Sequence, residues 1–521
     1  MTAPETMDNA RATRWLQTPM GRTIVAQIEA DPGLPQSSST ISSWQVPFHP
    51  DVGRIQSEAL PQFSDYIIIG SGVAGCGVVK SLLENSSPAQ SSVTVLEARG
   101  LCSGATGRNG GQLVKPYPSR FVQLAQDFGI EVAVKVFRLA NHTLEEMHKL
   151  ADSYDDQLRE DAAARRVTKM VAFMDQRSWI QGQKDAKFYE EHMPEERGLF
   201  KFLTKEQMKK EWNVKGAYGG LSFPSGVCWP YRLITGVFKR LQDQFPDRLN
   251  IETNTPVTTI LYDDKTDAKY PYIITTPRGI VKAAHVIHCT NGHTGHLLPR
   301  LRGKIFPMRE AMSAQHVGDK MPDMSDQMSW TFLEEPKFDS KTGMIRIGWV
   351  YGLQNRNNGG FWIGGEDRRP EEMIASDDSV ISIQGKVDLE TKLTQVFSHN
   401  WVPKQPRIQG IWTGIMASTG DTLPFVGNLP ASVTGRPGKG EWIAGGWNQY
   451  GMTNGLTCGE ALGRMVLGLK VPEIIPREYL ITEERLGNKK FATEASALDY
   501  LQWTTVGATI EKEDASGVSR L

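Results

Sequence analysis

Strand-like and helix-like patterns of apolar residues alternate along the chain from about residue 65 onward. The isoleucine-rich run at 66–69 is typical of a strand that is buried on both faces of a parallel sheet. A glycine-rich turn follows it, then a helical pattern at 78–83 and a second strand pattern at 92–97. Because parallel strands need a crossover between them, this order predicts a β-α-β unit.

The remaining patterns mix both kinds of element. Apolar residues recur at helical spacing between 121 and 150, and short strand patterns occur at 256–289 and 343–363. A last strand pattern, 442–444, leads through a glycine-rich turn into a helical pattern at 453–468. We therefore expect a protein of the α/β class, with mixed α+β character.

Composition and charge exclude several classes of protein. The 521 residues include 58 Lys and Arg against 59 Asp and Glu, so the formal net charge is −1. A nucleic acid or an anionic membrane favours a basic excess in its partner, so we expect no nucleic acid and no membrane as partners. The longest near-apolar stretch, 66–79, is too short to span a bilayer. The five cysteines include no Cys-x-x-Cys pair, which favours a reducing compartment.

Glycine is abundant, with 50 residues, and one cluster reads Gly70-x-Gly72-x-x-Gly75 between a strand and a helix. The first glycine permits a tight turn, the second lets backbone approach a pyrophosphate, and the third lets the helix pack closely on the sheet. The pyrophosphate then lies at the helix N-terminus. Glu97 ends the next strand, where a carboxylate binds a ribose hydroxyl group. The motif therefore predicts FAD or NAD and disfavours NADP.

Two further clusters favour FAD over NAD. Small residues fill 103–112, directly after the second strand pattern, and 442–452 repeats the strand-turn-helix order. A flavin needs backbone close to it along its whole length, whereas a nicotinamide enzyme needs no second small-residue loop there. The later helix N-terminus can stabilise negative charge on a reduced flavin ring. We find no second Gly-x-Gly-x-x-Gly for NADPH, which disfavours a flavin monooxygenase.

The segment 104–112 resembles the Gly-Ala-Ser/Thr-Gly-Arg-Asn-Gly-Gly-Gln/His segment of FAD-dependent amine and amino-acid oxidases. This superfamily includes D-amino-acid, glycine and sarcosine oxidases. The resemblance is closest to its γ-glutamylputrescine-oxidase-like branch, whose long fungal members have a similar leader. Other similar segments are 255–257, 289–292 and 412–427, and the resemblance covers about 65–468. It implies a Rossmann-like FAD-binding domain, a second, mixed-sheet substrate domain, and FAD as cofactor.

Together the motifs and the resemblance assign a cofactor site. Its members come from the glycine-rich turn, the end of the second strand, the small-residue loop, two short similar segments and the C-terminal turn. The expected FAD-binding residues are Gly70, Ser71, Gly72, Val73, Ala74, Gly75, Glu97, Ala98, Arg99, Ser103, Gly104, Ala105, Thr106, Arg108, Asn109, Gly110, Gly111, Gln112, Val257, Thr290, Asn291, Gly446, Asn448, Gln449, Gly451, Met452 and Thr453.

Departures from the family pattern concern the substrate and the flavin linkage. Amino-acid oxidases place an arginine for the substrate carboxylate where this chain has Met416, so we do not expect an α-amino acid to be held in that way. Sarcosine oxidases tether flavin to a cysteine where this chain has Gly414, so we expect non-covalent FAD. Where many relatives read Pro-x-Arg-Gly-Gln, residues 307–311 read Pro-Met-Arg-Glu-Ala.

The substrate pocket is expected to be aromatic. An amine must be neutral to give up hydride, and an apolar pocket favours the neutral form by lowering the amine pKa. Ordinary core packing is the alternative for each aromatic candidate, and a solvated surface position is the alternative for each arginine. The catalytic candidates are Tyr450, Tyr351, Trp447 and Arg309, with Trp349 and Arg356 as further pocket candidates.

Four histidines and a cysteine between 285 and 296 have spacings that could suit a metal. Residues 285–289 have a strand pattern, however, and neighbouring side chains on a strand point to opposite faces. We therefore expect structural or flavin-proximal histidines and no metal site, with His293 as the candidate that lines the flavin site.

The expected reaction is oxidation of a small molecule at a C–H next to an amine nitrogen. Its substrate would be an amine, an N-alkyl amino acid or an amine-bearing specialised metabolite. Hydride passes to flavin N5, the product is an imine, and O₂ reoxidises the flavin to release hydrogen peroxide. The alternatives are a flavin dehydrogenase or oxidative-cyclisation enzyme acting on a larger secondary metabolite, and a non-catalytic flavin-binding protein.

Domain boundaries and location complete the prediction. The tripeptide 519–521, Ser-Arg-Leu, is close to the peroxisomal signal Ser-Lys-Leu, so we expect a peroxisomal location, with the cytoplasm as the alternative. The expected segments are a leader at 1–62 that packs on the body and has a short helix near 20–30, an FAD-binding domain at 63–115, 215–300 and 405–475, a substrate domain at 116–214 and 301–404, and a C-terminal extension at 476–521.

Overall fold

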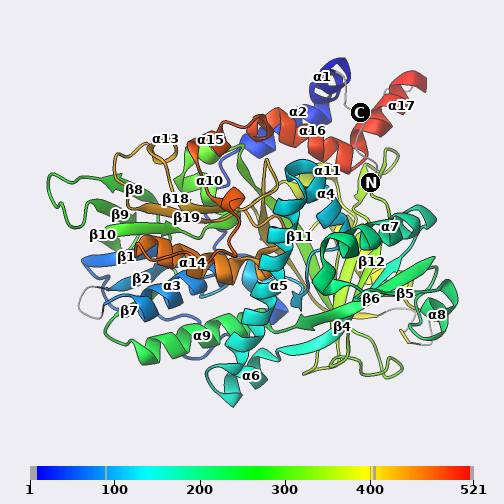
Figure 1. The fold of residues 1–521 in the computed structure, drawn as a ribbon, viewed down its shortest axis with the longest axis horizontal. Coiled ribbons are helices and arrows are strands. Elements are labelled where there is room, and N and C mark those ends of the chain that lie inside the picture. The colour runs from blue at the N-terminus through cyan, green and yellow to red at the C-terminus, as the bar shows by residue number, and fades with distance from the viewer. Residues whose placement is uncertain (1–8, 88–90, 399–400, 403–405, 517–521) are drawn as a thin grey trace.

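The computed structural model describes residues 9–87, 91–398, 401–402 and 406–516. They form two large sheets that lie side by side, with helices packed around them (Figure 1). This architecture confirms the predicted α/β class with mixed sheets. Among the described helices, none is both long and apolar enough to cross a membrane. The tripeptide 519–521, on which the predicted location depends, lies outside the described residues.

The first sheet has a parallel core. Its strands follow the order β18-β19-β10-β1-β2-β7, in which every neighbouring pair from β19 to β7 is parallel and β18 is antiparallel. The hairpin of β8 and β9 extends the sheet beside β10. Ile67 and Ile68 of β1 are fully buried, as expected for a strand covered on both faces. The strands are β1 (Phe63–Ile69), β2 (Val93–Leu96), β7 (Leu249–Glu252), β8 (Thr259–Tyr262), β9 (Tyr272–Thr276), β10 (Gly279–His288), β18 (Phe425–Asn428) and β19 (Glu441–Gly445).

The second sheet is mostly antiparallel. Its order is β17-β11-β16-β15-β12-β4-β6-β3, and only the β12–β4 pair among these described strands is parallel. β5 also pairs with β6, while β13 and β14 form a small separate hairpin. The strands are β3 (Gln112–Leu113), β4 (Arg165–Phe173), β5 (Lys201–Leu203), β6 (Gly219–Val227), β11 (Ile305–His316), β12 (Met328–Leu333), β13 (Lys337–Asp339), β14 (Met344–Arg346), β15 (Trp349–Gln354), β16 (Phe361–Gly364) and β17 (Arg407–Thr419).

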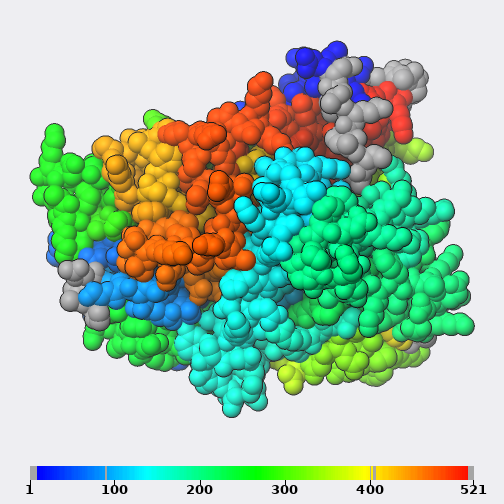
Figure 2. All heavy atoms as spheres, viewed as in Figure 1, coloured from blue at the N-terminus to red at the C-terminus, as the bar shows by residue number. Residues whose placement is uncertain are grey.

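Helices cover both sheets. α3 and α14 pack against each other beside the first sheet, and the orange and blue segments meet on this face in Figure 2. α4 contacts both α5 and α7 beside the second sheet. The helices are α1 (Asn9–Gln17), α2 (Pro19–Glu29), α3 (Val73–Asn85), α4 (Pro118–Phe128), α5 (Ile130–Asp152), α6 (Asp156–Ala162), α7 (Gln176–His192), α8 (Lys205–Lys210), α9 (Pro230–Gln244), α10 (Thr294–Leu297), α11 (Pro370–Met373), α12 (Ile383–Val396), α13 (Ala431–Thr434), α14 (Gly455–Val466), α15 (Glu483–Leu486), α16 (Thr493–Trp503) and α17 (Val506–Ser516).

The predicted β-α-β unit is present as β1, α3 and β2. α3 begins at Val73, earlier than the predicted 78–83, because it follows the glycine-rich turn directly. The later strand-turn-helix pattern corresponds to β19 and α14. These two units meet, since α3 and α14 pack together. The local patterns therefore located the two helices that border the site.

The leader contains two helices, where the sequence pattern indicated one. Trp15 of α1 and Ile24 of α2 are buried, in a cluster that also includes Tyr500 and Leu501 of α16. Figure 1 shows these N-terminal and C-terminal helices together at the upper edge of the molecule. The two ends of the described chain thus cover the same face of the body.

The two sheets divide the chain differently from the predicted domains. β17 lies within 405–475, a segment predicted for the FAD-binding domain, yet it pairs along its length with β11 in the second sheet. β6 lies within 215–300 and also belongs to the second sheet. These long strands find their partners in segments remote along the chain, which local patterns do not reveal.

Candidate functional site

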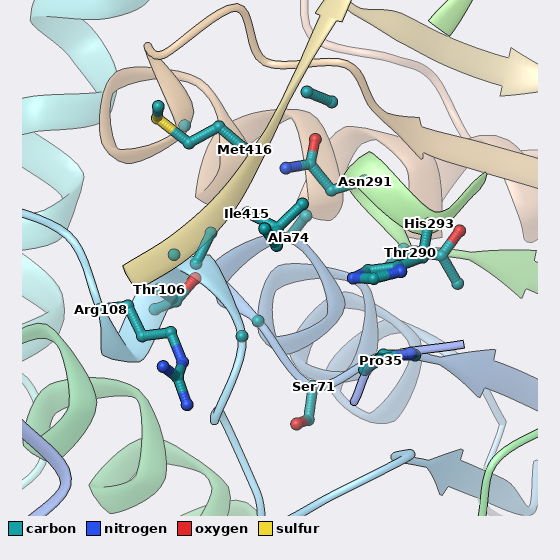
Figure 3. A pocket seen from close by; sticks show the side chains of 18 of the residues that line it. Pro35, Ser71, Ala74, Thr106, Arg108, Thr290, Asn291, His293, Ile415 and Met416 are labelled. Atoms are coloured by element: carbon teal, nitrogen blue, oxygen red, sulfur yellow. The ribbon is translucent and has the colours of Figure 1, made fainter. Parts of the chain in front are cut away.

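A cavity lies where the parallel strands of the first sheet end and the second sheet begins (Figure 3). Ligands commonly bind at the carboxyl ends of parallel strands in α/β folds. The lining comes from the leader, both sheets and the C-terminal turn: Gly33, Leu34, Pro35, Ile69, Gly70, Ser71, Gly72, Val73, Ala74, Leu96, Glu97, Ala98, Arg99, Gly104, Ala105, Thr106, Arg108, Asn109, Val257, Cys289, Thr290, Asn291, His293, His296, Leu297, Glu310, Met312, Tyr351, Asp378, Gly414, Ile415, Met416, Ala417, Trp447, Gln449, Gly451 and Met452.

The glycine-rich turn forms one wall of the cavity. Gly70 has φ +104°, a conformation that favours glycine. At Gly75 a Cβ would come within 2.2 Å of the Gly70 carbonyl oxygen, so only glycine lets α3 pack this close to the turn. The Val73 amide donates to Thr106 Oγ1 at 3.0 Å. The first amides of a helix lack intrahelical partners, so this end of α3 is suited to an anion.

Glu97 lies in the cavity wall next to the turn. Its carboxylate accepts hydrogen bonds from the Ser71 amide at 3.1 Å and the Ser71 hydroxyl at 2.6 Å. Its other oxygen accepts from the Arg99 amide at 3.1 Å. The Ser71 hydroxyl in turn accepts from the Cys102 amide at 2.7 Å. These bonds fix the carboxylate at the cavity edge, the position predicted for a ribose contact.

The leader holds the small-residue loop in place. Gln45 Nε2 donates to the carbonyl oxygens of Ser103 and Gly107, at 3.2 and 3.0 Å. Trp44 Nε1 donates to the Asn109 carbonyl oxygen at 2.5 Å. A second leader segment, Gly33 to Pro35, lines the cavity directly. Motif matching missed this contribution, because the leader lies outside the resemblance and contains no recognisable motif.

Two arginines of the cavity are held by one aspartate and by backbone. Arg99 Nη1 contacts both carboxylate oxygens of Asp378, at 3.0 and 2.8 Å. Arg108 donates to the carbonyl oxygens of Ser103 and Thr413, at 2.7 and 2.8 Å, and lies 3.7 Å from Asp378. Burial lowers the pKa of Arg108 to about 10, although Asp378 raises it. Both guanidinium groups are therefore committed to the protein. Asp378 was not predicted from the sequence.

The loop that includes the similar segment 289–292 also places His293 in the cavity wall. His293 Nδ1 lies 3.1 Å from the Gly33 carbonyl oxygen, and burial lowers the pKa of this histidine to about 4. It is therefore neutral at neutral pH. Asn291 Oδ1 accepts from the Gly446 amide at 3.1 Å, which joins this segment to the C-terminal turn. Val257 and Thr290 also line the cavity, as predicted for cofactor contacts.

The other histidines of the cluster point to separate partners. His288 Nε2 lies 3.2 Å from Glu441, His285 stacks on Tyr66, and His296 lies 3.1 Å from Asp31. In the part of the chain that the structure describes, no group of three or more His, Cys, Asp or Glu residues could hold a metal ion.

Several predicted cofactor residues lie behind the lining and support it. Asn448 Oδ1 accepts from the Thr419 amide at 2.9 Å, and Gln112 donates to the Gly352 carbonyl oxygen at 3.0 Å. At Gly110 a Cβ would come within 2.6 Å of the Tyr351 ring, so this glycine makes room for an aromatic side chain. The predicted residues outside the cavity lining are Gly75, Ser103, Gly110, Gly111, Gln112, Gly446, Asn448 and Thr453.

The four catalytic candidates occupy different environments. Tyr351 and Trp447 line the cavity, whereas Tyr450 and Arg309 are outside its lining. Burial raises the pKa of Tyr450, and the positive charge of Arg120 lowers it by a smaller amount. Arg309 donates to the Asp377 carbonyl oxygen at 3.0 Å. The site is therefore built from Tyr351 and Trp447, because the turn that carries Tyr450 directs Trp447, Gln449 and Met452 to the cavity instead.

The further pocket candidates lie away from the cavity. Arg356 is half exposed and pairs with Asp326 at 3.4 Å. Trp349 packs its ring 5.3 Å from the Tyr117 ring. Neither residue belongs to the cavity lining.

An acidic group beside Tyr351 was missed by sequence reasoning. Glu310 lines the cavity, and its carboxylate accepts from Tyr351 Oη at 3.3 Å. Arg368 lies 3.5 Å from Glu310 and 3.2 Å from Glu366, and all three groups are buried or nearly so. The available signal was the departure at 307–311, where Glu310 replaces the glycine of the family pattern.

The groups that line the cavity fit FAD. The cavity joins a helix N-terminus, a carboxylate at the end of β2 and a chamber bordered by Tyr351, Trp447 and Met416. At Gly104 a Cβ would meet no protein atom within 4 Å, so the open space beside this lining residue is the cavity itself. A side chain there would fill the space that a dinucleotide needs.

Comparisons with known proteins agree with this geometry. A family model described as FAD dependent oxidoreductase (DAO) matches residues 65–465. Similar solved structures include glycine oxidase from Geobacillus kaustophilus, with 15% identity and a TM-score of 0.59 over 81% of this chain and 99% of that one. L-proline dehydrogenase from P. horikoshii has 17% identity and a TM-score of 0.58, over 81% and 97%. L-Amino acid deaminase from Proteus myxofaciens has 15% identity and a TM-score of 0.59, over 87% and 98%. The comparison with curated proteins finds no match.

Proposed function

The chain belongs to the FAD-dependent oxidoreductase (DAO) family, and on that premise we propose that it is an oxidase for a C–H next to an amine nitrogen. The hydride leaves carbon, a proton leaves nitrogen, and the product is an imine. Molecular oxygen takes up the two electrons and the two protons that the substrate has released, and becomes hydrogen peroxide. Three similar structures are named as a glycine oxidase, an L-proline dehydrogenase and an L-amino acid deaminase, which supports a nitrogen-bearing substrate.

The observation that supports this proposal most is the continuity of the cavity. One end is bordered by the α3 N-terminus and Glu97, and the same cavity reaches Tyr351 and Trp447. A dinucleotide held at the first end would lie in the same cavity as these aromatic residues. Bound FAD supplies the two-electron acceptor of the reaction.

Named residues of this chain would hold the cofactor. The N-terminal turn of α3 would hold the diphosphate, and Glu97 would bind a ribose. β17 contributes Gly414 to Ala417 to the wall beside the loop of Thr106 and Arg108 (Figure 3). Cys289 is the one cysteine among the described residues that line the cavity, and burial raises its pKa to about 12. A protonated thiol is a poor nucleophile, which supports non-covalent binding.

The apolar residues of the chamber would exclude water from a bound substrate. Met312, Met416 and Trp447 are apolar lining residues of the same cavity as Tyr351. An apolar setting disfavours the charged ammonium form, so it lowers the pKa of a bound amine and favours the neutral form that can lose hydride.

Oxygen consumption with peroxide release tests the proposed reaction. The purified holoprotein is supplied with primary amines, N-methyl amino acids and cyclic amines in turn. We expect at least one donor to give equal amounts of consumed oxygen and released peroxide. A donor that reduces the flavin under anaerobic conditions, yet gives no peroxide in air, would identify a dehydrogenase instead.

A further inference from the structure

Glu310 is the acidic residue that the second sheet contributes to the cavity. It lies on β11 opposite Gly414 of β17, which has no side chain to cover it. Its side chain remains 18% exposed. Among the described lining residues from β11, β15 and β17, Glu310 is the one with a charge.

The partners of Glu310 leave its carboxylate with spare acceptor capacity. Tyr351 Oη and Arg368 Nη2 are its neighbours, at the long distances of 3.3 and 3.5 Å. Arg368 is closer to Glu366, at 3.2 Å. A carboxylate can accept about four hydrogen bonds.

The cationic residues of the cavity offer no matching site for an anion. Arg99 is bound by Asp378, and Arg108 is bound by backbone carbonyl oxygens. His293 is neutral at neutral pH because burial lowers its pKa to about 4. Met416, another lining residue, is uncharged. The chamber therefore favours a cation over a carboxylate.

We propose that Glu310 is a substrate-binding residue that accepts a hydrogen bond from a second, protonated amine nitrogen, so that the preferred substrate is a diamine or polyamine. This inference rests on the proposed function and names its substrate class. The reacting nitrogen must be neutral, whereas a second nitrogen keeps its proton. Tyr351 and Trp447 line the same cavity, and aromatic rings attract a cation placed over their faces.

Three five-carbon ligands test this inference on the holoenzyme. Cadaverine has a second ammonium group, pentylamine has a methyl group in its place, and δ-aminovalerate has a carboxylate. Binding is read from the shift in flavin absorbance and in Tm without oxygen, and turnover from KM and kcat. Charge-assisted hydrogen bonds contribute about 1.5–3 kcal/mol, so we expect cadaverine to bind about ten- to a hundredfold more tightly than pentylamine. δ-Aminovalerate should be the weakest ligand.

Variants separate a substrate contact from a structural role. Glu310→Gln should raise the Kd and KM of cadaverine by about tenfold or more and leave those of pentylamine nearly unchanged. Glu366→Gln is the matched control, because Glu366 contacts the same arginine but lies outside the lining. This control should keep the preference for cadaverine.

Each outcome is decisive. The inference is overturned if wild-type protein binds δ-aminovalerate as tightly as cadaverine, a result that needs no variant to fold. It is also overturned if Glu310→Gln keeps the full preference for cadaverine. If cadaverine binds preferentially but no amine reduces the flavin, the proposed reaction fails while the binding site stands. If amines reduce the flavin without regard to their second charge, the reaction stands and the inference fails.

Discussion

The buried Glu366 carboxyl group makes the stability of the folded protein depend on pH. Burial raises the pKa of Glu366 from 4.5 to about 7, Arg368 lowers it, and Glu310 raises it further. The folded protein therefore holds this proton up to about pH 7, whereas the unfolded chain releases it near pH 4.5. Between these values the folded state binds more protons, so stability falls as pH rises.

We expect Glu366→Gln to remove this pH dependence. Below about pH 4.5 the variant and the wild type should have similar stability, and above about pH 7 the variant should be the more stable. The largest possible slope for one linked proton is about 1.4 kcal/mol per pH unit. Unfolding in denaturant at a series of pH values measures it. Parallel stability curves for the two proteins would contradict this assignment.

Gly104 provides a test of the cofactor cradle at one position. Its φ is −76°, which any residue can adopt, and a Cβ there would meet only the open cavity. Gly104→Leu should therefore weaken FAD binding by at least about tenfold, with little change in the Tm of the apoprotein. The fluorescence of added FAD measures binding. The matched control is Gly487→Leu at an exposed position, which should bind FAD normally.

Predicted cofactor residues lie together in the cavity wall where one short segment contains the whole signal. Gly70, Glu97 and Thr106 line the cavity, and each was singled out by a motif or by spacing. Asp378 and Arg368 could not be found in this way. Their roles depend on partners far along the chain, such as Arg99 for Asp378, and no local pattern records that proximity.

At the scale of elements, some of the 50 glycines allow two helices to pack closely. The glycine-rich segment 442–452 is followed by α14, and Gly459 of α14 faces α3. A Cβ at Gly459 would come within 2.3 Å of the Ala74 carbonyl oxygen, and one at Gly463 within 2.6 Å of Ser81 Cβ. The glycines of α14 thus set the position of α3, whose first turn borders the cavity.

Gly459→Ala should push α3 away from α14. Overpacking of this kind costs about 1–3 kcal/mol, and the displaced α3 N-terminus should also bind FAD more weakly. Gly487→Ala is the control, since its Cβ would have only ordinary contacts, the nearest at 3.4 Å. Chemical denaturation and an FAD titration measure the two effects. Unchanged stability and affinity in Gly459→Ala would contradict this role of the glycine.

The leader is a further element on which the site depends. Gln45 is buried and donates to two carbonyl oxygens of the small-residue loop. Gln45→Leu leaves the Gly107 carbonyl oxygen without its side-chain donor, which costs about 1–3 kcal/mol, whereas the Ser103 carbonyl oxygen still accepts from Arg108. We expect a lower Tm and faster loss of FAD during gel filtration. Gln244→Leu, at an exposed helix end, should have neither effect.

The whole molecule is assembled from segments that no local pattern connects. β1, β2 and the segment that follows β10 supply one side of the cavity, while β11, β15 and β17 supply the other. The sequence predicted the parallel unit because its strands and helix are consecutive. The second sheet has remote pairs such as β12 with β4, so its order follows from packing of the complete chain. The same reason explains why Glu310 and Tyr351 meet in space.

Anaerobic reduction of the flavin by an amine tests the central claim most directly. Purified holoprotein is mixed without oxygen with a panel of amines, including diamines, N-methyl amino acids and cyclic amines, while the visible flavin absorbance is recorded. The account predicts that at least one amine bleaches the flavin and is converted to an imine or its hydrolysis products. A flavin that dithionite reduces, but that stays oxidised with every amine, would contradict it.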